Sequence, residues 1–290
     1  MPGLVHELEF AAAPGRWQLY RAEPVDELKG MVVEFWEVRG DLAAFRETLL
    51  PNGCVELMIN LGPAHRVLSE AGTSVWDTGW FSGLHERALI IESLEGTHLL
   101  SARMHPVGAT ALLGRRVARA ANAIVRLDDF IGPDAPALRD RACAATSPAE
   151  RFAILEDFLL GARATGEEAP AFAREAAAAI EAAHGNLRVT TLHERFGISR
   201  KHLAVSFERA VGVPMKSYAQ IRRFVWTLAR LQETSEVNWS MLSSEAGYSD
   251  QSHLARDFRR IGAASPTEYL RKRAPDGSAL LYEAEPPVAP

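Results

Sequence analysis

The stretch Gly247-Tyr-Ser-Asp-Gln-Ser-His-Leu-Ala-Arg-Asp-Phe-Arg-Arg-Ile-Gly-Ala-Ala-Ser-Pro-Thr-Glu-Tyr269 decides the fold of the C-terminal part of the chain. Gly247 suits the positive φ of a tight turn between helices. Ser249 is a good N-cap, and Asp250 in the first turn complements the helix dipole. Further on, Ser265-Pro266 is a cap followed by proline at the first helical position, which starts another helix. The stretch therefore predicts a turn and two successive helices.

The helix after the turn has one apolar face and one polar face. Leu254, Phe258 and Ile261 recur at i, i+4 and i+7, the spacing of a buried helical stripe. Residues of the types that bind bases and phosphates fall largely off this stripe: Gln251, Ser252, His253, Arg256 and Arg260. Glutamine pairs with adenine and arginine with guanine in the major groove. On an arbitrary amphipathic helix, such residues more often form an ordinary solvated face.

The same stretch closely resembles the second helix-turn-helix of AraC/XylS-type transcription regulators. The resemblance covers about a dozen positions, from Gly-Tyr-Ser-Asp-Gln-Ser-His-Leu-Ala-Arg-Asp-Phe-Arg-Arg to Ser-Pro-x-x-Tyr, and it favours DNA contact over the solvated face. The family usually has glycine where this chain has Ala263, and here the glycine is Gly262, so a local adjustment is expected at that helix end. The resemblance implies a sequence-specific DNA-binding regulator of transcription.

An earlier segment predicts a first helix-turn-helix. Thr191 and Glu194 have the spacing of a capping box, Gly197 suits the turn, and Ser199 caps a second helix. The candidate DNA contacts of this second helix are Arg200, Lys201, His202 and Ser206. This unit resembles the family less well, because His193 stands where a small residue usually packs and Pro214 comes one position early.

Basic charge is concentrated in the segment with the two units. Residues 186–273 hold 15 Lys and Arg against 8 Asp and Glu, a net charge of +7, whereas the remainder holds 17 against 29, a net charge of −12. A basic segment is the electrostatic footprint that DNA binding requires. The chain as a whole has a net charge of −5, so this asymmetry is more informative than the total.

The composition is that of an ordinary globular protein of two domains, with 290 residues and a hydrophobic fraction of 47%. No segment approaches about 18 uninterrupted apolar residues, and the N-terminus lacks a signal-peptide pattern. These features predict a cytoplasmic protein with no membrane partner. Cys54 and Cys143 lie far apart, so neither a disulfide framework nor a cysteine-rich zinc site is expected.

Residues 17 to 105 consist of short apolar runs separated by turn signals. The expected strands are 17–22, 31–38, 45–50, 54–61, 66–69, 88–93 and 98–104. The overall expectation is an α+β protein, with an N-terminal antiparallel β-barrel or sandwich of cupin-like type accompanied by helices, and a C-terminal all-α tandem helix-turn-helix. Helices are expected at 127–131, 135–144 and 148–160, which either pack on their own barrel or form a dimer interface.

Two further stretches resemble a poorly characterised sensor-like domain that precedes the DNA-binding part in one branch of AraC-type regulators. They are the run from Leu50 to Gly62 and the segment His105-Pro-Val-Gly-Ala109, with Ser82-Gly83 between them. The resemblance implies an N-terminal domain that binds a small effector or mediates homodimerisation, and RNA polymerase is a further partner to consider. An activator is the working expectation, although the residues do not distinguish activation from repression.

No catalytic or cofactor site is predicted. His65, His85, His98 and His105 with Glu56 and Glu86 lack the spacing of metal ligands, so no metal is expected. Six aromatic residues are candidates for a ligand pocket, with the core as their commoner place: Trp17, Phe35, Trp36, Trp76, Trp80 and Phe81. The alternatives are an enzyme on the N-terminal barrel with an appended DNA-binding module, and an architectural DNA binder without a ligand.

The domain boundaries follow from a small, polar stretch at 161–170, closed by Pro170, which has the composition of a linker. We expect a sensor-like domain with its helical segment at 1–163, a DNA-binding domain at 171–273 and a disordered tail at 274–290.

Overall fold

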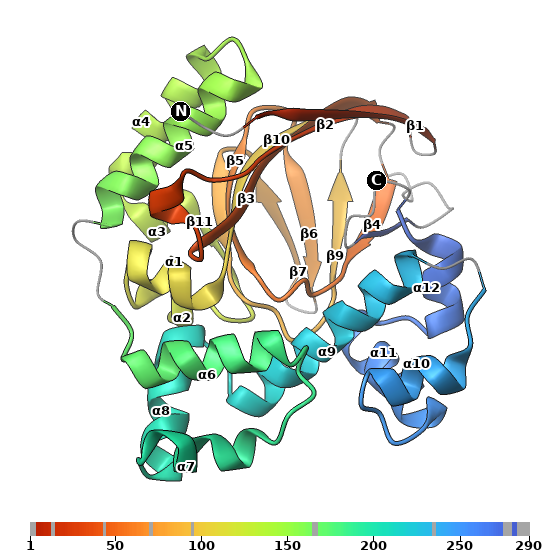
Figure 1. Ribbon diagram of the computed structural model, residues 1–290. Coiled ribbons are helices and arrows are strands. Elements are labelled where there is room, and N and C mark those ends of the chain that lie inside the picture. Colours follow the sequence, from red (N-terminus) through yellow and green to blue (C-terminus); the bar gives the residue numbers. More distant parts are fainter. Residues whose placement is uncertain are drawn as a thin grey trace.

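The computed structural model describes residues 4–12, 15–42, 45–69, 72–93, 96–163, 168–233, 236–274 and 280–282. Two antiparallel sheets form the N-terminal half, and helices form the C-terminal half (Figure 1). None of the helices in these ranges has the length and hydropathy needed to cross a bilayer.

The larger sheet has seven strands in the order β1-β2-β3-β10-β5-β8-β11. Their bounds are β1 His6–Ala12, β2 Gly15–Ala22, β3 Val32–Leu42, β10 Thr97–Met104, β5 Val55–Asn60, β8 Gly79–Ser82 and β11 Ile124–Arg126. Every residue of β5 is buried, because this central strand is covered on both of its faces.

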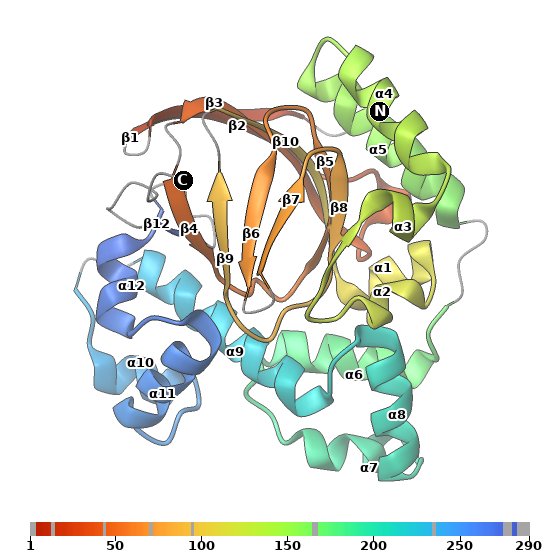
Figure 2. The ribbon, with the colours of Figure 1, turned by 180° about the vertical axis from the view of Figure 1, so that it is seen from behind.

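The smaller sheet has five strands in the order β12-β4-β9-β6-β7. Their bounds are β12 Leu280–Tyr282, β4 Phe45–Leu49, β9 Leu89–Ser93, β6 His65–Ser69 and β7 Gly72–Trp76. The two sheets face each other in Figures 1 and 2, and within the described residues neither closes into a ring. The predicted α+β class is therefore confirmed, with the sandwich and not the closed barrel as its first half.

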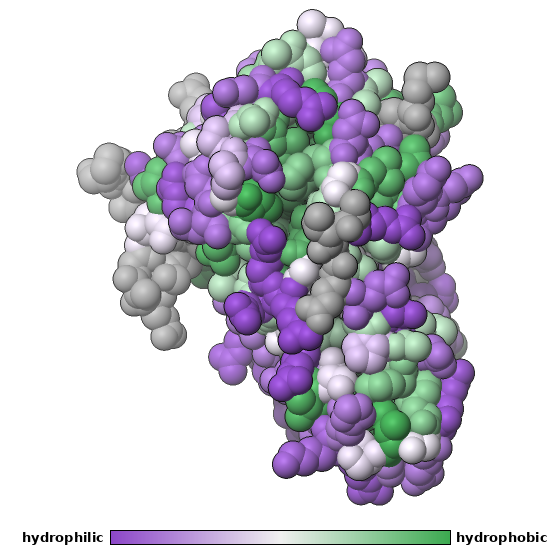
Figure 3. Space-filling model, turned by 90° about the vertical axis from the view of Figure 1, so that its left-hand side faces the viewer, coloured by the Kyte–Doolittle hydropathy of each residue, from purple (hydrophilic) through white to green (hydrophobic). Residues whose placement is uncertain are grey.

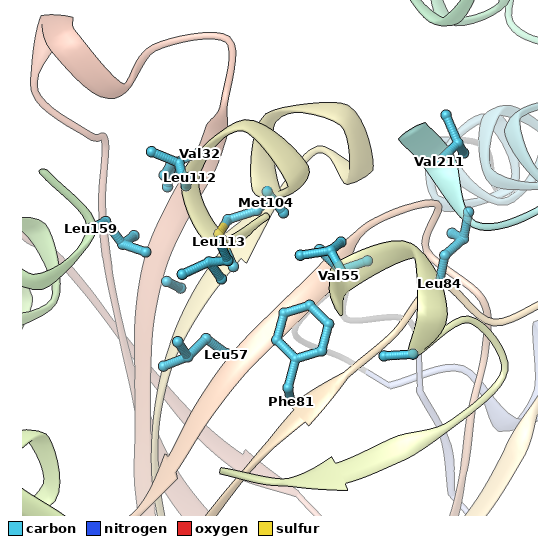
Figure 4. Packing of buried hydrophobic residues seen from close by; sticks show 14 of the residues in the cluster. Val32, Val55, Leu57, Phe81, Leu84, Met104, Leu112, Leu113, Leu159 and Val211 are labelled. Atoms are coloured by element: carbon cyan, nitrogen blue, oxygen red, sulfur yellow. The ribbon is translucent and has the colours of Figure 1, made fainter. Parts of the chain in front are cut away.

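Helices cover the side of the larger sheet that faces away from the smaller one (Figure 1). They are η1 Asp26–Leu28, α1 Pro106–Leu113, α2 Arg116–Arg119, α3 Leu127–Ile131, α4 Asp134–Ala144 and α5 Pro148–Arg163. In Figure 4 the buried cluster runs from Leu57 and Phe81 in the sheet to Leu113 of α1 and Val211 of the C-terminal half.

A buried ion pair fastens α5 to the larger sheet. Arg151 is 5% exposed and donates Nε to Glu37 Oε2 at 2.8 Å and Nη2 to Oε1 at 3.0 Å. His98 Nε2 lies 3.0 Å from the same carboxylate. Burial alone would raise the pKa of Glu37, but its hydrogen bonds with His98 and Arg151 hold the pKa below its usual range.

Figure 3 shows the molecule from the left-hand side of Figure 1. On this face, hydrophobic side chains gather in patches between hydrophilic ones.

The C-terminal half contains two helix-turn-helix units joined by the long helix α9. Its elements are α6 Ala171–Ala182, η2 Val189–Thr191, α7 Leu192–Phe196, α8 Arg200–Val211, α9 Met215–Gln232, α10 Trp239–Glu245, α11 Gln251–Gly262 and α12 Pro266–Lys272. The first unit is α7 with α8, and the second is α10 with α11. Gly197 and Gly247 have positive φ in the two turns, as predicted.

The C-terminal half packs directly on the sandwich. Thr110 of α1 donates its hydroxyl to the carbonyl oxygen of Ala210 at 2.8 Å. Ala88, just before β9, donates its backbone N–H to Ile261 at 2.7 Å. Both units are thus held against the N-terminal domain, each by its own backbone contact.

The prediction of a disordered tail is wrong for Leu280–Tyr282, which form β12 on the edge of β4. The Pro- and Glu-rich composition of this segment gave no sign of a strand, because the strand depends on a partner more than two hundred residues earlier in the chain. Residues 275–279 and 283–290 lie outside the described residues. The boundaries proposed at 163 and 171 stay predictions.

The seven expected strands all occur, whereas β1, β7, β8, β11 and β12 were not predicted. β8 and β11 are only four and three residues long, too short for an alternating pattern to be recognised. β1 contains two glutamates on an exposed edge, so it lacks the apolar character that marks a strand in sequence.

Candidate DNA interface and ligand cavity

The recognition helix of the second unit is α11, and its start differs by one residue from the prediction. Asp250 has extended backbone geometry, and its Oδ1 accepts the N–H of His253 at 2.7 Å. Asp250 is therefore the N-cap, and Ser249 lies one residue outside the helix. The predicted cap of α12 is confirmed, since Ser265 and Glu268 form a reciprocal capping box.

The exposed face of α11 is formed by Ser252, Arg256 and Arg259. They follow the i, i+4, i+7 spacing opposite to the buried Leu254 and Phe258. Arg259 was not among the predicted contacts, although helical spacing from Ser252 and Arg256 identifies it. This face carries two guanidinium groups, with five N–H donors each.

Two predicted contacts on α11 also have partners within the protein. Arg260 donates Nη2 to Asp257 Oδ1 at 2.9 Å within the same helix. His253 packs edge-on against the ring of Tyr248, 5.1 Å away, with Nδ1 3.3 Å from the hydroxyl of Ser249. Gln251 is exposed at the start of the helix. The His253 ring therefore helps to hold the unit together, whereas the Arg260 side chain is 42% exposed.

The first unit presents a different face. The Ser199 hydroxyl accepts the N–H of His202 at 3.2 Å, which confirms the predicted cap of α8. The predicted capping box of α7 is wrong, because the Thr191 hydroxyl instead donates to Arg188 O at 2.9 Å in the preceding turn. The residues at the outward spacing on α8 are Lys201, Val205 and Glu208.

The other predicted contacts of α8 lie beside that face. Arg200 Nε is 3.4 Å from His193 Nε2, and the ring of His202 lies 5.2 Å from that of Phe172 on α6. Ser206 is half-buried. Of the four predicted residues, Lys201 alone occupies the outward spacing.

The two recognition helices can be compared position by position, because Leu203 and Leu254 occupy equivalent buried sites 51 residues apart. At the same offset, Lys201, Val205 and Glu208 of α8 correspond to Ser252, Arg256 and Arg259 of α11. The outward face of α8 therefore has no net charge, and that of α11 has a charge of +2. Phosphate attraction and guanine recognition both favour the second unit.

Arg223 of α9 links the turn of the second unit to the segment that follows α6. Its guanidinium donates to Gly247 O at 3.2 Å and to Gly185 O at 3.3 Å, and it lies over the ring of Tyr248. This arginine is thus committed to the protein interior, and its place in the basic segment does not make it a DNA contact.

A cavity of about 180 Å³ lies between the two sheets. Four of the six aromatic residues singled out in the sequence line it: Trp17, Trp36, Trp76 and Trp80. Phe35 and Phe81 are fully buried in the core on the other side of the larger sheet. Aliphatic side chains from both sheets complete the wall, including Leu49 of β4 and Leu280 of β12.

The charged groups of the cavity are paired with one another. Arg103 donates Nε to Glu56 Oε1 at 2.9 Å and also donates to Glu34. Arg21 Nε lies 3.9 Å from Glu34, and Glu47 adds a third carboxylate to the lining. Two guanidiniums thus face three carboxylates, which disfavours an anionic ligand.

The uncharged polar groups of the cavity include donors that no atom of the described residues satisfies. Among the described residues, no acceptor lies within hydrogen-bond distance of Nε1 of Trp36 or Trp76, and both nitrogens are buried. Burial lowers the pKa of His65 and that of His85 to about 4, so both imidazoles are neutral at pH 7. The cavity therefore suits a neutral molecule that brings acceptors.

The histidines considered as metal ligands are dispersed. His98 is paired with Glu37, His105 Nδ1 lies 3.5 Å from Glu181, and His85 Nε2 is 3.1 Å from the Ser82 hydroxyl. Within the described ranges, no three His, Cys, Asp or Glu residues are grouped closely enough to hold a metal ion.

Two parts of the chain match known protein families. Residues 192–272 match the family described as a helix-turn-helix domain, and residues 20–126 match a domain of unknown function, DUF6597. The F1 operon positive regulatory protein of Yersinia pestis is 32% identical over 73 residues, which are 25% of this chain and 24% of that protein. The chain thus spans about a quarter of the length of this curated relative.

Similar solved structures include ToxT from Vibrio cholerae O395, at 11% identity and a TM-score of 0.46, with 82% of this chain and 97% of that chain covered. The AraC-like transcriptional activator CuxR is 11% identical, with a TM-score of 0.30 over 91% of this chain and 82% of its own. Both likenesses are weak in sequence and in superposition. The two matches show an AraC-type helix-turn-helix domain at residues 192–272, preceded along the chain by an N-terminal domain of uncharacterised kind.

Proposed function

We propose that the protein regulates transcription by binding a specific DNA sequence, and that α11 of the second unit makes most of the base contacts. The observation that supports this is the outward face of α11, where Ser252, Arg256 and Arg259 follow one another on successive turns. In a major groove, Arg256 has the chemistry for bidentate contact with guanine, and Arg259 for a base or a phosphate. The first unit adds Lys201 and weaker, less specific contacts.

Selection of bound sites from random DNA by the full-length protein tests this proposal. Enrichment of a defined motif is expected, and enrichment of no motif would contradict sequence-specific binding by the free protein. On the selected site, Arg256→Ala should weaken binding by about 1–3 kcal/mol, roughly 5- to 150-fold. Arg141→Ala on α4 removes the same charge outside the DNA-binding half and should leave the affinity unchanged. An equal loss on selected and scrambled DNA would assign Arg256 to a phosphate.

We further propose that the cavity between the sheets binds the effector, a small uncharged aromatic molecule with a hydrogen-bond acceptor. A cavity of about 150 Å³ holds one benzene ring, so the 180 Å³ found here suits a single ring with a short substituent. Tryptophan side chains supply flat apolar walls, and the indole N–H groups of Trp36 and Trp76 supply donors that have no acceptor among the described residues.

Benzamide and benzoate form a matched pair for testing this ligand chemistry, because they differ in charge and little in shape. Benzamide should raise the melting temperature of the protein, and benzoate should not, because three carboxylates line the site. Trp36→Phe, which removes one donor and keeps an aromatic ring, should reduce the benzamide effect. Stronger stabilisation by benzoate would contradict the charge argument.

A binding role accounts for the cavity better than a catalytic one. The Ser82–His85 pair has the geometry of a nucleophile and a base, but a histidine with a pKa of about 4 is a weak base. Burial raises the pKa of the Cys54 thiol to about 11, so it is largely protonated at pH 7. We therefore propose that the protein is not an enzyme. Contact with RNA polymerase and homodimerisation stay predictions from the family resemblance.

A further inference from the structure

The strand β12 belongs to two parts of the molecule at once. It continues from the DNA-binding half and pairs antiparallel with the edge of β4, with Leu280 opposite Leu49 and Leu281 opposite Thr48. Close to the end of α12, Ala274 N donates to Leu280 O at 3.1 Å. The last described residues of the chain therefore complete the smaller sheet of the N-terminal domain.

The two leucines of β12 point to opposite sides, as successive residues of a strand must. Leu280 lines the cavity next to Leu49, its cross-strand partner. Leu281 is 3% exposed and belongs to the hydrophobic core of the second helix-turn-helix, with Leu231 and Tyr269. One side of the strand therefore faces the cavity, and the other side packs on the second helix-turn-helix unit.

The second unit is attached to the same edge of the sheet at two further points. Leu50, directly after β4, is 2% exposed in the core of the second unit, and Gly262 of α11 lies so close that a Cβ there would be 3.3 Å from Leu50 Cδ2. Ala88, directly before β9, donates to Ile261 O at 2.7 Å. β12, β4 and β9 are consecutive in the sheet, so these contacts form one continuous attachment.

We infer that β12 is a strap that couples the contents of the cavity to the position of the second helix-turn-helix. The inference rests on the proposed role of the cavity as effector site. A molecule that fills the cavity touches Leu280 and therefore favours the docked strand, which in turn holds α10, α11 and α12 against β4. By thermodynamic reciprocity, DNA that prefers a different position of the second unit lowers the affinity of the cavity for its ligand.

The strap can be removed selectively. A chain ending at Ala274 lacks β12, and a chain ending at Tyr282 keeps it, so the second is the matched control. The first measurement is amide hydrogen exchange in β4 and in α10–α12. The second is the modification rate of Cys54, a half-buried residue of the cavity wall, by methyl methanethiosulfonate. Cys143 is exposed and serves as an internal standard in every variant.

Removal of β12 should raise exchange in β4 and in α10–α12 at least tenfold and should raise the Cys54 rate at least tenfold, with Cys143 unchanged. The chain ending at Tyr282 should match the full-length protein in all three. If exchange in α10–α12 or the Cys54 rate is unaffected by the loss of β12, the strap does not couple the two parts, and the inference is overturned.

A cross-linked variant covers the case in which the shortened chain does not fold. Thr48→Cys with Leu281→Cys places two thiols at directly opposed positions, on the side of the sheet away from Cys54. The oxidised form should slow both exchange in α10–α12 and Cys54 modification relative to the reduced form, and no difference would contradict the coupling. None of these measurements requires DNA or a ligand, so failure of the proposed DNA recognition or effector chemistry shows separately, in site selection and in benzamide binding.

Discussion

Glu208 on the outward face of α8 is the residue whose replacement should most increase DNA affinity. It occupies the position that Arg259 holds on α11, 51 residues later. With α8 in a major groove, its carboxylate would face the phosphate backbone at roughly 7 Å, where two unit charges in water interact by about 0.6 kcal/mol. Glu208→Gln removes one repulsion of this size, and Glu208→Arg replaces it with an attraction.

The expected gain for Glu208→Arg is therefore about 1.2 kcal/mol at low ionic strength, or about sevenfold in affinity. At physiological salt the Debye length of about 8 Å reduces the effect to about 0.5 kcal/mol, roughly twofold. Fluorescence anisotropy with the selected DNA site, over a series of salt concentrations, measures both values. The plot of log affinity against log salt should also become steeper by up to about one unit.

Asp140→Arg is the control for this experiment, because it changes the net charge equally at an exposed position of α4. It should leave the affinity and the salt dependence nearly unchanged. Equal gains for the two variants would show a long-range effect of net charge. No gain for Glu208→Arg at low salt would refute the placement of α8 against DNA.

Three predictions concern stability. Arg151→Met leaves Glu37 buried without its main partner and should lower the free energy of unfolding by about 3–5 kcal/mol, measured by urea denaturation. Ala263→Gly should stabilise the folded protein by about 1 kcal/mol, because Ala263 has a φ of +54°. Gly262→Ala should destabilise the folded protein by about 1–3 kcal/mol through overpacking. Thermal melts in which Gly262→Ala raises the melting temperature and Ala263→Gly lowers it would contradict both. The pKa of His85 is about 4 in the folded protein and about 6.5 when unfolded, so the unfolded state binds more protons between these values. Stability should fall as the pH drops from about 6.5 toward 4, and His85→Gln should flatten that slope in urea denaturation at each pH.

The sequence determined the elements whose signals are local. The apolar spacing of Leu254, Phe258 and Ile261, the turn glycine Gly247 and the cap at Ser265 lie within a few turns of one another, so their physical meaning is independent of the rest of the chain. The same holds for the seven predicted strands and for the resemblance to AraC-type regulators. The sequence also indicated that the first unit matches the family less well than the second, because Val205 stands at a position that often faces the groove in the family.

Tertiary structure decided which of these residues are available. His253 has the right chemistry for DNA, but its contacts with Tyr248 and Ser249 turn it toward the protein, and no pattern along the chain reports such contacts. The cavity depends on four tryptophans from β2, β3, β7 and β8, which only the packing of two sheets brings together.

β12 is the clearest case of long-range determination. Three residues form a strand here because β4 offers an edge with which they can pair. The entropic cost of bringing together residues more than two hundred positions apart is already offset by the packing of the two domains. The sequence therefore determined what the C-terminal half is, through local periodicity and capping. The attachment of that half to the cavity depends on the three-dimensional packing, because strand pairing joins residues far apart in the chain.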